Sequence, residues 1–344
     1  MIASYRKYIL NFKRPSGTSR GVLTEKETWF LKISDGNRYG IGECGILRSL
    51  SYDDRPDYED KLKWVCENIQ LGEEKLWEEL RDFPSIQFGV EMAFRSLRAE
   101  DPFLLFPSEF TRGEKSIPIN GLIWMGDKDF MKKQISEKIE AGFNCIKLKI
   151  GAIDFETELD LLKSIRENFS ANEIELRVDA NGAFSPETAL EKLQKLSKYD
   201  LHSIEQPIRQ GQIQAMAGLC EKTPLPIALD EELIGVTDAT EKRKLIQTIR
   251  PQFAIFKPSL IGGFKGTTEW KDTCETNQVD WWITSALESN IGLNAIAQWT
   301  YTLEPDLPQG LGTGSLYTNN FASPLEVKNG NIHYNPEKEW EINY

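Results

Sequence analysis

Three acidic residues each close a short hydrophobic run, and their spacing indicates a metal site. Asp179 ends the run in ELRVDAN, Glu205 the run in HSIEQPI and Asp230 the run in PIALDEE. The steps of 26 and 25 residues between them match about one strand, loop and helix of a βα repeat, so the three side chains would meet at one end of a parallel barrel. Carboxylate oxygens alone favour a hard cation, Mg2+ first and Mn2+ second.

Lysines flank the acids and suggest proton transfer beside a carboxylate. The motif CIKLKIG places Lys147 and Lys149 at the end of one strand-like run, and AIFKPSLIGG places Lys257 at the end of another. Removing a proton next to a carboxylate leaves an enediolate, whose negative charge a divalent metal can carry. The like charge of Lys147, a metal ion and partial desolvation would favour the neutral, basic form of Lys149. Lys257 would arrive on the opposite side of the substrate.

Strand parity extends this set of candidate residues. Residues two apart point to the same face of a strand. If Asp179 points into the barrel, Arg177 and Asn181 do so too, whereas Leu148 and Val178 face the surrounding helices. We therefore predict that Arg177 and Asn181 contribute to substrate binding.

Each motif taken alone also has a structural interpretation. A K-x-K pair is typical of a solvated strand end, and Asp179 or Asp230 could cap the next helix. Glu205 has no obvious capping role, because Gln206 and Pro207 follow it directly. The order of the whole set at βα spacing favours the functional interpretation.

The elements that must position these residues follow the pattern of an α/β protein with a separate cap. Residues 1–45 alternate as strands and residues 57–100 are helical in period, which predicts an N-terminal α+β capping domain over 1–112. From 113 to 320 strand-like runs alternate with helical ones, which predicts a (β/α)8-type barrel. The eight predicted strands are, in order, INGLIW, CIKLKI, IELRVDA, HSIEQP, PIALDE, FAIFKP, WWITSA and PQGLGTG.

Two further elements can be predicted from local signals. A helix begins with Ser185 as N-cap and Pro186 at its first position. Residues 321–344 suggest two short strands around Asn329-Gly330, a hairpin that we expect to return to the N-terminal sheet and complete the cap.

Composition excludes several classes of protein. The net charge of −12 and pI near 5.0 argue against nucleic acid and anionic membrane partners. Five scattered cysteines without a C-x-x-C motif and only two histidines argue against disulfides and zinc, and fit a reducing cytoplasm. No apolar run approaches the length of a membrane span or a signal core, so a soluble, unprocessed protein is expected. The sequence leaves the oligomeric state open.

Two loop signals could concern the substrate. Gly262-Gly263 and G-L-G-T-G at 310–314 could cradle an anion with backbone N–H groups, or form tight turns only. The segment PSGTSRG at 15–21 is interpreted as a mobile lid with Arg20 touching the substrate, or as an ordinary hairpin loop.

The motifs together carry a resemblance over nearly the whole chain. The order K-x-K, D-x-N, E-Q-P, L-D-E and K-P-S…GG after an α+β domain resembles the muconate lactonizing enzyme subgroup of the enolase superfamily, whose general site chemistry is well established. SALESNIGLNAIAQW (285–299) followed by GLGTG is similar to the o-succinylbenzoate synthase family of menaquinone biosynthesis. The resemblance implies Mg2+ ligands at Asp179, Glu205 and Asp230, a base at Lys149, an anion-stabilising lysine at Lys257, polar site positions at Lys147 and Arg177, and contacts to a succinyl tail around Ser285, Gly312 and Thr313.

The resemblance also implies the reaction and its alternatives. It implies a small carboxylate substrate and the syn dehydration of 2-succinyl-6-hydroxy-2,4-cyclohexadiene-1-carboxylate to 2-succinylbenzoate. N-acylamino acid racemization and dipeptide epimerization on the same scaffold stay open, although PQGLGTGSLY lacks the acids with which dipeptide epimerases usually hold an ammonium group. A metal-stabilised barrel that only binds a partner is a third reading.

Overall fold

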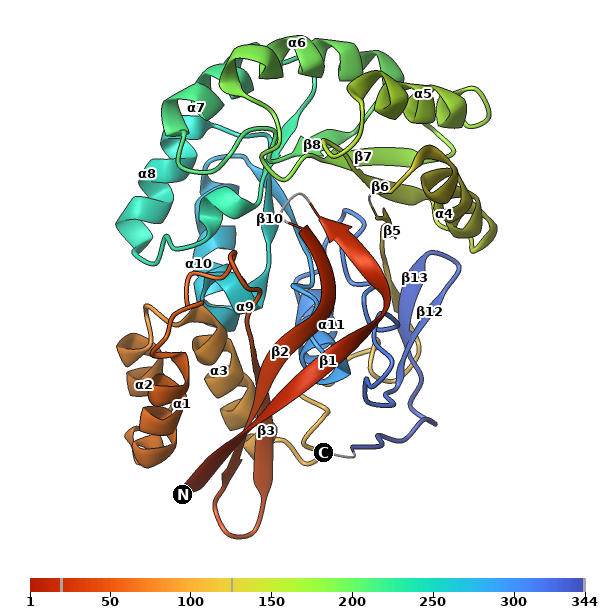
Figure 1. Ribbon diagram of the computed structural model, residues 1–344. Helices are drawn as coiled ribbons and strands as arrows, with labels where there is room; N and C mark the ends of the chain where they lie inside the picture. Colours follow the sequence, from red (N-terminus) through yellow and green to blue (C-terminus); the bar gives the residue numbers. More distant parts are fainter. Residues whose placement is uncertain (19–20, 125, 343–344) are drawn as a thin grey trace.

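An antiparallel sheet and three helices form the N-terminal part of the protein, as the sequence predicts. The computed structural model describes residues 1–18, 21–124 and 126–342. The sheet has the order β1-β2-β3 and the helices follow it in the chain (Figure 1). The bounds are β1 (Ile2–Thr18), β2 (Gly21–Ser34), β3 (Tyr39–Gly45), α1 (Tyr58–Glu67), α2 (Glu73–Glu79) and α3 (Pro84–Arg98).

The central strand of this sheet is buried on both faces. In β2, Trp29, Leu31 and Ile33 pack in one hydrophobic cluster with α1, α2 and α3. Phe30 points the other way and joins the larger cluster that contains the barrel core. Alternate residues of a strand face opposite sides, so the apolar run TWFLKI connects the cap helices on one face with the rest of the protein on the other.

A parallel sheet forms the second part, with helices outside it (Figure 1). Seven strands pair in the order β11-β10-β9-β8-β7-β6-β5. They are β5 (Gly121–Ile123), β6 (Cys145–Lys149), β7 (Glu175–Asp179), β8 (Ser203–Glu205), β9 (Ile227–Leu229), β10 (Phe253–Phe256) and β11 (Asp280–Ile283). The helices are α4 (Lys128–Glu140), α5 (Phe155–Arg166), α6 (Pro186–Leu196), α7 (Ile213–Lys222), α8 (Ala239–Ile249), α9 (Pro258–Ile261), α10 (Gly263–Thr276) and α11 (Asn290–Thr302). Helix α6 begins after Ser185, with Pro186 at its first turn, as predicted.

The prediction of an eighth strand at PQGLGTG is wrong in its extent. The segment forms only single-residue parallel bridges, Gln309 with Ile119 and Gly310 with Thr284. A side chain at Gly310 would meet the Thr284 side chain at 2.4 Å, so the close approach to β11 requires glycine. The bridges still join the two ends of the sheet, and the barrel closes through them.

The C-terminal hairpin forms where predicted, but its predicted partner is wrong. Strands β12 (Leu325–Lys328) and β13 (Asn331–Tyr334) flank Asn329 and Gly330, whose φ angles of 49° and 67° suit a tight hairpin turn. Strand β13 pairs with β4 (Ser116–Pro118), not with the N-terminal sheet. The reason is apolar register, since Ile332 lies opposite Ile117 and both are buried.

The chain just before the hairpin is the part that reaches the N-terminal sheet. The backbone N–H of Thr318 donates to the carbonyl of Asn11 at 2.9 Å. The side chain of Asn319 donates to the carbonyl of Ile9 at 2.7 Å and accepts from the N–H of Asn11 at 2.8 Å. The division into residues 1–112, completed by 321–344, and 113–320 stays a prediction.

Two buried carboxylates of the N-terminal part anchor helices of the barrel. Glu43 accepts hydrogen bonds from the N–H groups of Ser289 and Gly292 at the start of α11, at 2.9 and 2.8 Å. Glu91 accepts from the N–H groups of Phe264 and Lys265 in the first turn of α10, at 2.6 and 3.0 Å. A carboxylate satisfies the unpaired N–H groups and the positive end of a helix, so the cap is bonded to the helices that follow β10 and β11.

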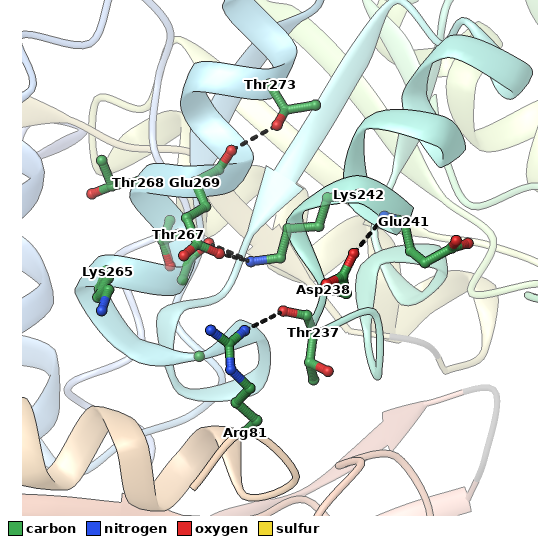
Figure 2. A network of polar contacts seen from close by, with 12 residues as sticks. Arg81, Thr237, Asp238, Glu241, Lys242, Lys265, Thr267, Thr268, Glu269 and Thr273 are labelled. Atoms are coloured by element: carbon green, nitrogen blue, oxygen red, sulfur yellow. Dashed lines mark hydrogen bonds and ion pairs between the residues drawn. The ribbon is translucent and has the colours of Figure 1, made fainter. Parts of the chain in front are cut away.

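A polar network lies where the cap meets α8 and α10 (Figure 2). The Lys242 ammonium, with its side chain only 2% exposed, donates to the Glu269 carboxylate at 2.8 Å and to the carbonyl of Gly266 at 3.1 Å. Arg81, next to the cap helix α2, reaches the carbonyl of Thr237 at 3.4 Å. Burial lowers the pKa of Lys242 although Glu269 acts against this. The buried cation therefore depends on Glu269.

We expect unequal effects when the two partners of this ion pair are replaced. Glu269→Gln leaves a buried ammonium without its carboxylate and should cost about 3 kcal/mol of stability. Lys242→Met keeps the buried stem and removes the charge, while Glu269, 28% exposed, can turn to water, so the cost should stay below about 1 kcal/mol. Urea unfolding of both variants tests this. A greater loss of stability in Lys242→Met than in Glu269→Gln would contradict the conclusion that the buried ammonium depends on Glu269.

Within the described ranges of the chain, none of the helices is both long and apolar enough to cross a membrane.

Candidate active site

Strand register brings three of the predicted residues into one row. In the parallel pairing of β6 with β7, Lys149 lies opposite Asp179, and in the pairing of β7 with β8, Asp179 lies opposite Glu205. Each of the three is the last residue of its strand. Neighbouring strands are about 4.8 Å apart, so the row brings side chains from distant parts of the sequence within reach of one another.

Asp230 and Lys257 follow directly after the next two strands, β9 and β10, respectively. Lys147 lies two residues before Lys149 and opposite Arg177. Leu148 and Val178 belong to the hydrophobic core, in agreement with the predicted parity.

The lysines and acids form a continuous network of ion pairs. Lys147 donates to Glu205 at 2.7 Å and lies 3.3 Å from Asp179. Lys149 donates to Asp179 at 2.8 Å. Lys257 donates to Asp230 and lies 3.9 Å from Glu205. The acids are at most 2% exposed, so each buried carboxylate has a lysine as its counter-charge.

The electrostatics of this network are set by burial and by the neighbouring charges. Burial opposes the charged form of Lys147, but Glu205 and Asp179 outweigh it and raise the pKa of this lysine. Burial likewise opposes the charged form of Asp179, yet Lys149 and Lys147 hold the pKa of its carboxyl below the usual range. Burial and the adjacent charge of Asp179 raise the pKa of Glu205 to about 8. At Glu205, the nearby lysines therefore do not fully offset the effects of burial and of the negative charge of Asp179.

The donor set fits a hard divalent cation. The Oε1 atom of Glu205 is buried and has no hydrogen-bond partner, and the nitrogen of Lys257 lies 3.9 Å away from it, beyond hydrogen-bond distance. Carboxylate oxygens are the ligands that Mg2+ and similar ions prefer. Among the described residues, no three His, Cys, Asp or Glu side chains stand grouped as ready ligands, since the lysines hold these carboxylates. A bound cation would have to replace ammonium groups as their counter-charge.

Two amide side chains orient the row. Asn181 accepts from the Lys149 ammonium at 2.7 Å and donates to Glu231 at 3.1 Å. The side-chain oxygen Oε1 of Gln206 accepts from the backbone N–H of Asp230 at 3.2 Å. Asn181 is thus placed beside the candidate base, whereas Gln206, which the sequence interpretation used only as part of E-Q-P, ties the end of β8 to the end of β9.

A cavity of about 720 Å3 lies over this network. Lys147, Lys149, Asp179, Asn181 and Lys257 line it. The loops after β11 and after the closing bridges also line it, with Ser285, Gly312 and Thr313. The structure therefore brings these predicted residues to one pocket, of a size that suits a small organic ligand.

One of the predicted substrate contacts, Arg177, does not line this pocket, and another, Arg20, cannot be assigned a place. Arg177 does not line the cavity, because its guanidinium lies lower in the barrel, where it donates to Glu175 at 2.7 Å and to the carbonyl of Pro308 at 2.9 Å and covers the ring of Trp282. Parity gives the face of a strand but not the direction in which a long side chain extends. Arg20 lies outside the described residues.

Several lining residues were not predicted. The cap contributes Leu23, Leu47, Arg48 and Leu50, and Trp124 lies just after β5. No chemical motif marks these positions in the sequence, because isolated residues near turns have no distinctive pattern. The leucines and Trp124 add apolar surface to the pocket, and Arg48 adds a cation.

The fold and the site define the class of protein. The model of the enolase C-terminal domain-like family matches residues 131–338, more than half of the chain, and the chain belongs to this family. Within it, the chain is a homologue of o-succinylbenzoate synthase. It is 47% identical to the enzyme of that name from Desulfotalea psychrophila, over 96% of this chain and 98% of the relative.

Solved structures agree with this assignment. The crystal structure of MenC from Desulfotalea psychrophila superposes with a TM-score of 0.86 at 43% identity, covering 97% of this chain and 99% of that one. The o-succinylbenzoate synthase of Thermosynechococcus elongatus, solved with Mg in its active site, superposes with a TM-score of 0.73 at 23% identity, covering 90% of this chain and 92% of that one. At this lower identity the second structure supports the fold only.

Proposed function

We propose that this protein is an o-succinylbenzoate synthase, a hydro-lyase that converts 2-succinyl-6-hydroxy-2,4-cyclohexadiene-1-carboxylate to 2-succinylbenzoate in the formation of menaquinone. The row formed by Lys149, Asp179 and Glu205 carries this proposal, since it places a base beside acids suited to a metal. The 47% identity to an o-succinylbenzoate synthase selects the substrate among those that such a site could serve.

We propose Mg2+ as the cofactor, with Mn2+ as a substitute. Asp179, Glu205 and Asp230 would hold the ion, and the lysines that now pair with them would turn toward the substrate. When bound, the ion would supply positive charge for the substrate carboxylate, which becomes more negative as the adjacent proton leaves. The donor set supports this choice, because carboxylate oxygens are the ligands that Mg2+ prefers.

The residues of this chain then perform the proton transfers. Lys149 takes the proton from the carbon beside the carboxylate, while Asn181, 2.7 Å away, orients its amine. Lys257, which directly follows β10 and is separated from Lys149 by strands β7, β8 and β9, stabilises the negative charge on the substrate. The C–O bond to the ring hydroxyl breaks, and the protonated Lys149 donates the proton that turns the leaving hydroxide into water. One water molecule is lost overall, and the ring becomes aromatic.

The backbone of residues 311–315 suits the second carboxylate of the substrate. These residues line the cavity, and the described part of the protein offers no acceptor to their N–H groups. Consecutive free N–H groups form a seat for an anion. We propose that the succinyl carboxylate binds there, across the cavity from Lys149.

A comparison of two substrates tests the proposal. We expect the Mg2+-loaded protein to dehydrate synthetic 2-succinyl-6-hydroxy-2,4-cyclohexadiene-1-carboxylate with a kcat/KM above about 10⁴ M⁻¹s⁻¹, within the usual range for enzymes. Racemization of an N-succinylamino acid, followed by exchange of its α-proton in D2O, should be slower by at least tenfold. If only racemization is found, the proposal fails and the protein is an N-acylamino acid racemase.

We also propose a cytoplasmic location. All five cysteines are free thiols in the structure, which suits a reducing compartment.

A further inference from the structure

A buried carboxylate behind the cavity wall has no place in the proton transfers. Glu288 is completely buried and precedes α11, whose N-cap is Ser289. No lysine or arginine of the described chain forms an ion pair with it. Burying a carboxylate without a cation is costly unless hydrogen bonds compensate.

Glu288 joins segments that follow neighbouring strands. Its Oε1 accepts from the Ser259 hydroxyl at 2.5 Å, and its Oε2 accepts from the Ser285 hydroxyl at 2.6 Å. Ser259 lies in the short helix α9 after β10, and Ser285 lies in the loop after β11, so one carboxylate fixes both segments.

The hydrogen bonds of Ser285 are all committed. Its one proton goes to Glu288, and its oxygen accepts from the Thr313 hydroxyl at 2.8 Å and from the N–H of Leu287 at 3.0 Å. A hydroxyl has one donor and two acceptor positions, so Ser285 has none left for a ligand. Because Ser285 donates its proton to Glu288, it can only accept from Thr313. The Thr313 proton therefore points to Ser285 and away from the cavity.

We propose that Glu288 is a positioning residue for the succinyl end of the substrate. It acts through Ser285 and Thr313 and holds residues 311–315 so that their N–H groups face the distal carboxylate. Ser285 and the Thr313 hydroxyl support this seat and do not themselves bind the anion. The inference rests on the proposed function, because it assigns the group that this seat receives.

The chain of hydrogen bonds dictates the choice of variants. Glu288→Met removes both acceptors while it keeps an unbranched side chain of similar length. Glu288→Gln keeps one acceptor. Because Ser285 can accept no further bond, it must face the amide oxygen, and Ser259 can accept from the amide N–H. Gln should therefore preserve the link to Thr313.

Binding of two ligands to the Mg2+-loaded protein tests the proposal. 2-Succinylbenzoate carries the distal carboxylate, and 2-acetylbenzoate lacks it. Titration calorimetry, with displacement for the weaker ligand, measures both affinities. Glu288→Met should lower the affinity for 2-succinylbenzoate at least about tenfold and the affinity for 2-acetylbenzoate less than twofold. Glu288→Gln should retain the affinity for both within about threefold. Ser259→Ala, which cuts only the other bond of Glu288, should leave the ratio of the two affinities unchanged.

A double-mutant cycle separates positioning from direct contact. Thr313→Val breaks the same chain, so it should add little to Glu288→Met. Ser285→Ala gives the same information if Glu288→Met does not fold. Equal weakening of both ligands, or additive effects of Thr313→Val and Glu288→Met, would overturn the inference. If the wild-type protein binds 2-acetylbenzoate but neither binds 2-succinylbenzoate nor dehydrates its precursor, the proposed function fails, and this inference with it.

Discussion

Replacing Lys149 with alanine should reduce dehydration at least about 10³-fold, because it removes the amine that hydrogen-bonds Asn181 and ends the row across β6, β7 and β8. The fold should survive. Asp179 keeps Lys147 at 3.3 Å as a counter-charge, and a residue at the mouth of a barrel contributes mainly to activity.

Turnover and thermal unfolding of the same preparation measure the two effects. Lys75→Ala, a change on the exposed face of α2, controls for handling and should retain full activity. An active Lys149→Ala protein would refute the assignment of the base. A loss of the folded state would transfer the test to Lys149→Met, which keeps the apolar stem.

Replacing Glu205 with glutamine should remove both metal binding and turnover. Glu205 lies in the middle of the acids, opposite Asp179 in the strand register and 1% exposed. At a Mg2+ concentration of about 100 times the dissociation constant, binding should stabilise the wild-type protein by about 2.7 kcal/mol. The variant should show no such gain, and its turnover should fall at least about 10²-fold.

The metal-free forms should behave differently. Glutamine keeps an oxygen that can accept from Lys147 and removes a buried negative charge beside Asp179, so the variant should be at least as stable as the wild type without Mg2+. Thermal unfolding with Mg2+ and with a chelator measures both quantities. A Mg2+-induced shift of the same size in Glu205→Gln would place the ion elsewhere.

Most of the charged row could be predicted from the sequence, because the spacing of these acids and lysines also implies that they lie close together. A residue at the end of a parallel strand lies beside its equivalent in the next repeat, so steps of about one repeat between Asp179, Glu205 and Asp230 already imply proximity. The parity of β6 and β7 likewise predicts that Leu148 and Val178 face the core, as they do.

Other features depend on distances that the sequence does not contain. Parity places Arg177 inside the barrel but does not give the direction of its side chain. Lys147, opposite it in the register, lines the cavity, whereas the Arg177 guanidinium turns to Glu175. The turn at Asn329-Gly330 predicts a hairpin without indicating whether β4 or the cap offers the free edge. A carboxylate before a helix is usually a cap, and only the contacts of Glu288 with Ser259 and Ser285 show that it joins helix α9 to the loop after β11.

The crystal structure of this protein with Mg2+ and 2-succinylbenzoate tests the central claim most directly. We predict that Asp179, Glu205 and Asp230 hold the ion together with the benzoate carboxylate, and that Lys149 and Lys257 leave their present carboxylate partners and face the ring from opposite sides. The succinyl carboxylate should lie on the N–H groups of residues 311–315. A metal bound by other residues, or both lysines on one side of the ring, would contradict the account.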